Sequence, residues 1–165
     1  MIRIATEADL PAIVAIYNAA VPGRMATADT EPVTVDSRRE WFEAHTLDRH
    51  PLWVDDRGGE VAGWLSLGRF YNRPAWDITA EVSVYVAPAH QRQGVAAALL
   101  ETAIAEAPAL GLRVLIGIIF GHNEPSLALF RRFGFERWGF MSRAVELDEV
   151  ERDVVFMGRR VDGAQ

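Results

Sequence analysis

A continuous apolar stretch constrains the fold of this chain more than any other segment. Residues 113–120 read Arg-Val-Leu-Ile-Gly-Ile-Ile-Phe, with no polar residue after the first. A strand with one solvated face alternates apolar and polar residues, whereas an unbroken apolar run is typical of a strand buried on both faces. A strand of that kind needs helices on both sides of its sheet. The sequence therefore predicts an α/β fold.

Periodicity and capping residues place the remaining elements around this strand. Thr6-Glu7-Ala8-Asp9 and Ser37-Arg38-Arg39-Glu40 resemble capping boxes, and Asn123 precedes a helix that has proline in its first turn. The acid-rich stretch 146–153 predicts a solvated loop. The expected order is β-α-α-β-β-β-α-β-α-β-β in a single domain over residues 1–165, with a mixed central sheet. Its strands are expected at 2–5, 52–54, 61–70, 79–87, 113–120, 135–141 and 153–161, and its helices at 6–20, 37–45, 94–107 and 123–133.

Composition excludes several classes of chemistry. The chain has no cysteine, which rules out disulfides, thiolate catalysis and cysteine-ligated metals. All 17 cationic residues are arginine, so a Walker lysine and a lysine Schiff base are excluded. The four histidines show no metal-ligand spacing, and we expect no metal.

Charge and hydropathy limit the partners and the location. The net charge is −6 and no dense basic patch is present, so we expect no nucleic-acid partner. No apolar run approaches the ~20 residues of a membrane span, and we expect no membrane partner. The first residues run directly into a helix start, which predicts no signal peptide and a cytoplasmic protein.

A glycine-containing loop at the start of a helix is the sharpest chemical feature. Pro88 ends a strand, and Gln91-Arg92-Gln93-Gly94-Val95-Ala96 opens the next helix. Gly94 lets backbone approach a ligand, and free N–H groups at a helix start favour pyrophosphate. The spacing differs from the dinucleotide fingerprint, and a plain turn would fit the same string.

Two further positions are candidates for chemistry. Glu81 lies in a strand among valines, where desolvation would raise its pKa and suit a general base. The alternation of that strand fits a solvent-facing carboxylate equally well. Asn123 and Ser126 are three residues apart, hence on one face of a first helical turn. Asn123 also fits a simple N-cap.

These residues resemble a known superfamily. The string Gln91–Ala96 is similar to the Gln/Arg-x-x-Gly-x-Gly/Ala pattern that follows the fourth strand in the GNAT superfamily of acyl-CoA N-acyltransferases. Within it, the chain resembles the phosphinothricin (methionine sulfoximine/sulfone) acetyltransferase family over about residues 2–160. The matching stretches are Thr30–Thr34, Arg73–Trp76, Glu81–Val86, Asn123 with Ser126 and Leu127, Phe133–Phe135, and Asp153.

The resemblance implies a site for acetyl-CoA between the fourth and fifth strands. Backbone of Val84, Tyr85 and Val86 would pair with the pantetheine arm, Asn123 would contact that arm, and Ser126 would lie beside it. Glu81 would take a proton from the substrate ammonium, and the amine would attack the thioester directly. The implied pyrophosphate-binding residues are Gln91, Arg92, Gln93, Gly94, Val95, Ala96 and Ala97.

The resemblance also implies the acceptor side and marks two departures. Arg73, Trp76 and Thr27 would face a small amino acid or analogue, acetylated on its α-amino group, and the protein would be a homodimer. The stretch 129–131 lacks the tyrosine that many members use as general acid, so Tyr85, a water or an unprotonated thiolate would serve. Ala28 stands where the family often has phenylalanine.

Two other functions remain open from the sequence. The same fold could acetylate another amine, such as a protein N-terminus or a polyamine. A non-catalytic acyl-CoA-binding sensor would keep the glycine loop and leave Glu81 idle.

Overall fold

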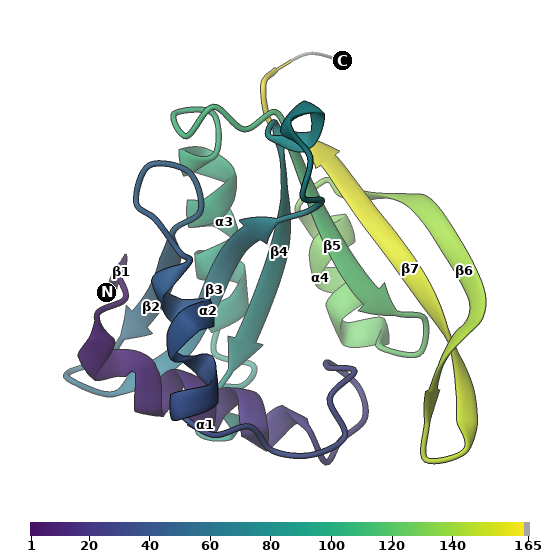
Figure 1. Cartoon of the computed structure of the whole chain (residues 1–165), viewed down its shortest axis with the longest axis horizontal. Coiled ribbons are helices and arrows are strands. Elements are labelled where there is room, and N and C mark those ends of the chain that lie inside the picture. Colours follow the sequence, from purple (N-terminus) through teal and green to yellow (C-terminus); the bar gives the residue numbers. More distant parts are fainter. Residues whose placement is uncertain (164–165) are drawn as a thin grey trace.

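A seven-stranded sheet runs through the centre of the molecule (Figure 1). The computed structural model describes residues 1–163. The strand order across the sheet is β1-β2-β3-β4-β5-β7-β6. Only β4 and β5 are parallel, and every other neighbouring pair is antiparallel, so the sheet is mixed as predicted. The strands are β1 (Ile2–Ile4), β2 (Leu52–Asp56), β3 (Val61–Arg69), β4 (Thr79–Val86), β5 (Val114–Phe120), β6 (Glu136–Leu147) and β7 (Val150–Arg160).

Helices cover both faces of the sheet, as Figure 1 shows, with α1 and α2 on one face and α3 and α4 on the other. The larger core cluster joins α3 and α4 to the sheet, and a second cluster joins α1 and α2 to β2 and β3. None of the helices in residues 1–163 is long and apolar enough to cross a bilayer. The helices are α1 (Leu10–Ala20), α2 (Arg39–Glu43), α3 (Val95–Glu106) and α4 (Glu124–Arg132), with 3-10 turns η1 (Glu7–Asp9), η2 (Asp36–Arg38), η3 (Pro74–Trp76) and η4 (Pro88–His90).

The alternation of β4 decides which side chains face which helices. Ala80 and Val82 belong to the core cluster under α3. Tyr85 packs in the cluster beneath α1, stacked on Trp64 with ring centroids 4.7 Å apart. Because successive strand residues point to opposite faces, Glu81 faces the α1 side together with Tyr85.

Two glycines let helices approach the sheet closely. A Cβ at Gly63 would lie 2.7 Å from Val95 Cγ1 and 2.8 Å from the Tyr85 carbonyl oxygen. A Cβ at Gly117 would lie 2.5 Å from the ring of Phe130. Glycine at position 63 therefore allows the first turn of α3 to sit directly on β3.

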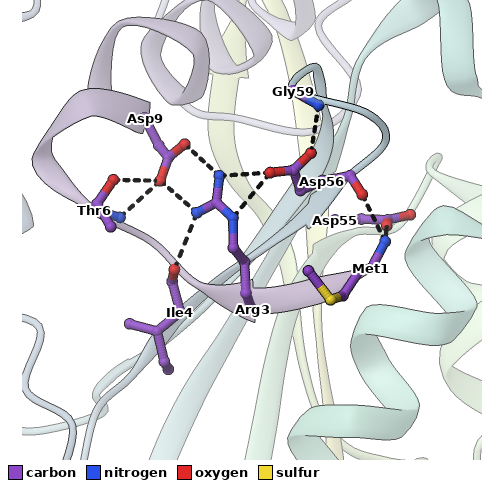
Figure 2. Close-up of polar contacts among 8 residues, drawn as sticks. All are labelled: Met1, Arg3, Ile4, Thr6, Asp9, Asp55, Asp56 and Gly59. Carbon is purple, nitrogen blue, oxygen red and sulfur yellow. Dashed lines mark hydrogen bonds and ion pairs between the residues drawn. The ribbon is translucent and has the colours of Figure 1, made fainter.

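An ion-pair network fixes the N-terminal edge of the sheet (Figure 2). Arg3 donates to both carboxylate oxygens of Asp9, at 2.8 and 2.9 Å, and its Nε donates to Asp56 at 3.0 Å. Asp9 also accepts from the backbone N–H of Thr6 at 2.7 Å, which completes the predicted capping box. These contacts tie β1 to the start of α1 and to the end of β2.

The order of helices and strands agrees with the prediction, but two local predictions are wrong. Ser37 does not cap a helix, because η2 already begins at Asp36 and the Ser37 hydroxyl donates to the Thr34 carbonyl oxygen at 2.8 Å.

The acid-rich stretch 146–153 is a hairpin rather than a loop. Only Asp148 and Glu149 form the turn, both left-handed, with φ of 50° and 64°. Leu147 packs against Phe120 and Val154 in a small core cluster, and this burial extends the strands beyond the predicted boundaries.

Candidate active site

The sheet opens between β4 and β5. These strands pair at three positions only, Thr79 with Val114, Ala80 with Leu115 and Glu81 with Ile116. Beyond that point β4 continues to pair with β3 as far as Val86, and β5 continues to pair with β7 as far as Phe120. Figure 1 shows the two strands diverging from this point. Within the described residues, the backbone of Val84, Tyr85 and Val86 has a strand partner on the β3 side alone.

The predicted glycine loop lies at the far end of β4 and opens α3. Gly94 is the N-cap of α3 in a left-handed conformation, with φ of 80°, and Arg92 is also left-handed, with φ of 59°. The first backbone bond into this helix runs from Ala98 to the Gly94 carbonyl, which leaves the N–H groups of Val95, Ala96 and Ala97 unused by the helix. The loop thus presents several donors and the positive end of a helix dipole.

An arginine outside the motif holds this loop. Arg57, in the turn between β2 and β3, donates to the side-chain oxygen of Gln93 at 3.0 Å and to its carbonyl oxygen at 3.4 Å. Its Nε also donates to Asp55 at 3.1 Å. Gln91 and Arg92, two of the residues implied for the pyrophosphate site, are both exposed.

Glu81 occupies the last position at which β4 and β5 are paired. Burial raises the pKa of its carboxyl group above the ordinary value. Its Cα partner on β3 is Gly68, where an added Cβ would meet nothing within 4 Å. The carboxylate therefore has open space beside it, in a cavity of about 790 Å³ that it lines together with His45, His50, Arg49 and Arg69.

A second cavity of about 180 Å³ lies farther along the same face of the sheet. Four aromatic side chains line it, those of Tyr17, Trp41, Trp64 and Tyr85, together with Arg38. The guanidinium of Arg38 lies 4.8 Å from the centroid of the Tyr17 ring and pairs with Asp29 at 3.0 Å. Trp41, Ser66 and Ser83 line both cavities, so the two spaces adjoin.

A loop crosses from one arm of the opening to the other. His122 Nε2 bonds to the Arg24 carbonyl oxygen at 2.8 Å, and Asn123 Nδ2 donates to that of Met25 at 2.9 Å. From the β4 side, the Tyr85 hydroxyl donates to the Ala26 carbonyl oxygen at 3.0 Å. Three consecutive carbonyls are thus bonded from both sides of the opening.

Some predicted residues lie in this arrangement and others lie outside the two cavities. Thr27 is buried, and its hydroxyl bonds to the Tyr17 hydroxyl at 2.5 Å. Arg73 precedes η3 and is exposed, and Trp76 packs against Phe70 and Tyr71 while remaining 43% exposed. Neither Arg73 nor Trp76 lines the two cavities.

The predicted pair at the start of α4 is also close in space. Asn123 Oδ1 accepts from the Ser126 backbone N–H at 3.2 Å, which makes Asn123 the N-cap of α4. Its amide nitrogen donates to the Met25 carbonyl oxygen, so the capping interpretation is confirmed and the contact with the pantetheine arm stays a prediction.

Sequence reasoning missed several residues of the site. Arg38, Arg49, Arg69 and His122 had no recognisable spacing, because their neighbours in the fold come from distant segments. Tyr17 lies within the predicted helix 6–20, where nothing in the sequence distinguishes it from its neighbours. No group of three or more histidine, aspartate or glutamate side chains in the described part of the chain is arranged to hold a metal ion.

Two known proteins align with nearly the whole of this chain. A protein of Bacillus subtilis (strain 168) named "Putative phosphinothricin acetyltransferase YwnH" is 48% identical over 161 residues, covering 97% of this chain and 98% of that protein. An L-methionine sulfoximine/L-methionine sulfone acetyltransferase of Pseudomonas paraeruginosa (strain DSM 24068 / PA7) is 37% identical over 162 residues, covering 98% of this chain and 94% of that protein.

A solved structure with the same fold includes the acetyl donor. It is a GNAT superfamily phosphinothricin acetyltransferase from Sinorhizobium meliloti in complex with AcCoA, 32% identical, with a TM-score of 0.91 over 97% of this chain and 87% of that chain. The model of the acetyltransferase (GNAT) family matches residues 13–135, from within α1 to the end of the α4 region. That match contains the diverging strands, the glycine loop and Glu81, and this chain therefore belongs to the acetyltransferase (GNAT) family.

Proposed function

We propose that this protein transfers an acetyl group from acetyl-CoA to the α-amino group of a small amino acid or analogue, of the phosphinothricin, methionine sulfoximine or methionine sulfone type. One observation carries the proposal: the half-buried Glu81 carboxylate lies where β4 and β5 separate and faces a cavity large enough for such an acceptor. The names of the relatives support the acceptor class.

The donor is assigned to the opening between β4 and β5. The pantetheine arm would pair with the backbone of Val84, Tyr85 and Val86, which has a strand partner on one side only. The pyrophosphate would bind at residues 91–97, where the first-turn N–H groups of α3 are free. Asn123 and Ser126 would line the other arm, at the start of α4.

Glu81 is assigned the role of general base. An ammonium group is not nucleophilic, so a proton must leave before the nitrogen attacks the thioester carbonyl carbon. Glu81 takes that proton, directly or through a water, and its raised pKa brings its basicity closer to that of the amine. The new N–C bond forms as the C–S bond breaks, and the sulfur leaves as thiolate or thiol.

Tyr85 is the phenol nearest to this chemistry along β4. Burial and the neighbouring Tyr17 raise the pKa of its hydroxyl, which keeps it protonated at neutral pH. It would supply a proton to the leaving sulfur if one is needed. A thiol has a pKa near 8.5, so the sulfur can also leave as thiolate without that proton.

The loop at residues 24–27 and the η3 region are assigned to the acceptor side. Thr27, Arg73 and Trp76 remain part of the proposal through the family resemblance.

The homodimer and the cytoplasmic location are also proposed. Exposed apolar side chains on the β6–β7 hairpin, those of Trp138, Phe140 and Met141, support a covered surface there. The cysteine-free composition fits a reducing compartment.

The test is thiol release from acetyl-CoA by the purified protein. The acceptor panel contains phosphinothricin, methionine sulfoximine, methionine sulfone, the common amino acids and several polyamines. We expect saturable turnover with an amino acid or analogue. We expect Glu81→Gln to lower kcat by about 10²- to 10⁴-fold with the Kd for acetyl-CoA unchanged. Turnover with polyamines alone would favour a different amine, and acetyl-CoA binding without any turnover would favour a sensor.

A further inference from the structure

Glu81 has to release a proton within each reaction cycle if it acts as the base. The acceptor enters as an ammonium ion and leaves as an amide, so its nitrogen loses two protons. The first leaves before the nitrogen attacks, and the second leaves as the N–C bond forms and the C–S bond breaks. The sulfur accepts at most one of them, so at least one proton must reach solvent. The half-buried Glu81 carboxyl group therefore needs a neighbouring base that takes its proton onward.

His50 lies in the same row of the sheet as Glu81. The backbone N–H of Leu67 donates to the Pro51 carbonyl oxygen at 3.0 Å, so β3 stays paired with the chain one residue before β2 begins. A residue that precedes proline favours an extended backbone, which continues this register. One step farther, His50 falls beside Gly68, and Gly68 is the Cα partner of Glu81 on the other side.

The side chains of this row share one face of the sheet. Leu52 and Val54 belong to the core cluster beneath α1. Because side chains alternate along an extended chain, His50 falls on that same face, as Glu81 does. Gly68 places no side chain between them, and even a Cβ there would meet no atom within 4 Å. Both His50 and Glu81 line the cavity of about 790 Å³.

The separation within the row suits a proton transfer. Two strand spacings of roughly 4.8 Å put the two backbones about 10 Å apart. An imidazole from one side and a carboxylate from the other span that gap directly or with one water between them. The glycine between the two residues keeps this path clear.

The charges around His50 keep its imidazole neutral. Burial lowers the pKa of the ring, the nearby cations Arg69 and Arg49 lower it further, and the Asp77 carboxylate opposes the shift. The ring is therefore neutral at pH 7 and has a lone pair that accepts a proton. Burial raises the pKa of Glu81, so the proton affinities of the two groups approach each other. A proton then moves between them at a small cost in free energy.

The other titratable side chains of this cavity do not suit the step. Its arginines have no lone pair to accept a proton. Hydrogen bonds lower the pKa of Asp48, which makes it a weaker base than Glu81. His45 also lowers the pKa of His50, but it follows α2 and lies outside the row, where its Nδ1 donates to the Trp41 carbonyl oxygen at 2.8 Å.

We propose that His50 is a positioning residue that takes the proton from the Glu81 carboxyl group and passes it to solvent, which returns Glu81 to its basic form within the cycle. The proton moves from the ammonium nitrogen to Glu81, from Glu81 to the imidazole and from the imidazole to water. Nε2 of His50 is buried without a hydrogen-bond partner among residues 1–163, so an imidazolium there is costly and passes its proton on. The inference rests on the proposed function, because it requires Glu81 to act as base.

Rescue by imidazole tests this relay. The assay is thiol release at pH 7 with saturating acetyl-CoA and the best amino-acid acceptor from the screen. We expect His50→Ala to lower kcat by about 10- to 100-fold, less than the loss of a direct general base. The KM for the acceptor should change by less than about threefold, because His50 does not hold the acceptor. Added imidazole should raise the kcat of His50→Ala by about tenfold, with saturation, and leave wild type unchanged.

The pH dependence separates a relay from a structural role. His50→Gln keeps a polar side chain that cannot take a proton, and it serves if His50→Ala does not fold. As pH rises from 7 to 9, more of the acceptor arrives as free amine and brings one proton fewer. The kcat deficit of His50→Gln against wild type should therefore narrow by at least about threefold. A deficit that is equal at both pH values, together with no imidazole rescue of His50→Ala, would show a structural role and overturn the proposal.

His45→Ala is the matched comparison, because it removes the same type of side chain from the same cavity. Imidazole should not restore whatever activity this variant loses. Rescue of His45→Ala in place of His50→Ala would overturn the assignment, and so would a wild-type kcat in His50→Ala and His50→Gln. If wild type acetylates no acceptor, or if Glu81→Gln keeps the wild-type rate, the proposed function or its base fails and the relay fails with it. A normal loss in Glu81→Gln without any effect at His50 overturns the relay alone.

Discussion

The side-chain amide of Asn123 bonds at both of its ends. Nδ2 donates to the Met25 carbonyl oxygen at 2.9 Å, and Oδ1 accepts from the backbone N–H of Ser126 at 3.2 Å. One residue at the start of α4 thereby holds the loop that we assign to the acceptor side. Together with the bonds from His122 and Tyr85, this amide connects that loop to both arms of the opening.

Asn123→Asp tests this connection. The substitution keeps the oxygen that caps α4 and replaces the donor with an oxygen facing the Met25 carbonyl. We expect the free energy that holds the loop in place to fall by about 1–2 kcal/mol, which is the cost of an unmade hydrogen bond at a half-buried group. Trypsin should then cut after Arg24 faster than in wild type. The control is Asp148→Asn, which removes the ion pair of Arg24 with Asp148 at 2.8 Å and leaves the other bonds of the Arg24 side chain and the carbonyl contacts of the loop intact. Equal cleavage of wild type and Asn123→Asp would contradict this role.

Glu81 should lower the stability of the protein at neutral pH. Burial raises the pKa of its carboxyl group in the folded state, so the folded protein binds this proton more tightly than the unfolded chain. Stability then falls as pH rises through the interval between the two pKa values, and the full penalty is present above the folded one. Glu81→Gln removes the penalty, and we expect a higher Tm than wild type at pH 8 and no gain at pH 4. Thermal unfolding at the two pH values measures this, and a Tm gain that is the same at both would contradict it.

Gly94 should affect cofactor affinity more than stability. It is left-handed with φ of 80°, and a Cβ there would meet no atom of the protein within 4 Å. Alanine at this position costs about 1–2 kcal/mol of backbone strain. Gly111 is the matched control, because its φ is 74° and its surroundings are equally open. We expect Gly94→Ala and Gly111→Ala to lose similar stability, and only Gly94→Ala to weaken acetyl-CoA binding, measured by calorimetry. If Gly94→Ala and Gly111→Ala bind acetyl-CoA with equal affinity, the glycine loop does not form the phosphate site.

The network in Figure 2 should protect the fold against mild acid. Hydrogen bonds from Arg3 lower the pKa of Asp9 from 3.8 to about 2. An acid with a lowered pKa stabilises the fold above its unfolded pKa and loses that contribution as pH falls through the folded value. Asp9→Asn should cost about 2 kcal/mol in urea unfolding at pH 6, and the difference should narrow between pH 4 and pH 2. Asp36→Asn, at an exposed ion pair with Arg39, should cost under about 1 kcal/mol.

The fold was largely predictable because its signals are local. The capping box of Thr6 and Asp9, the N-cap at Asn123 and the apolar run 113–120 each act within a few residues, and each lies where expected. The prediction of a loop at 146–153 was wrong because Leu147 packs on Phe120 and thereby extends the strands of the hairpin. That contact joins distant segments of the chain. No count of acidic residues reveals that contact.

The site was predictable only in part. Glu81 and Gly94 are candidates from the sequence because a strand pattern and a loop motif contain them. His50 and Arg38 become candidates only when the fold is known, because the residues that line a cavity with each of them come from distant segments. The same holds for His122, whose bond to Arg24 spans 98 positions.

The short ladder between β4 and β5 has a mechanical consequence. Three residue pairs join these strands, and Glu81 belongs to the last of them. If the two arms swing apart or together, the displacement grows with distance from that vertex, so the Gly94 end travels farthest and Glu81 hardly moves. The geometry allows the mouth of the opening to widen around an entering chain while the Glu81 carboxylate keeps its place.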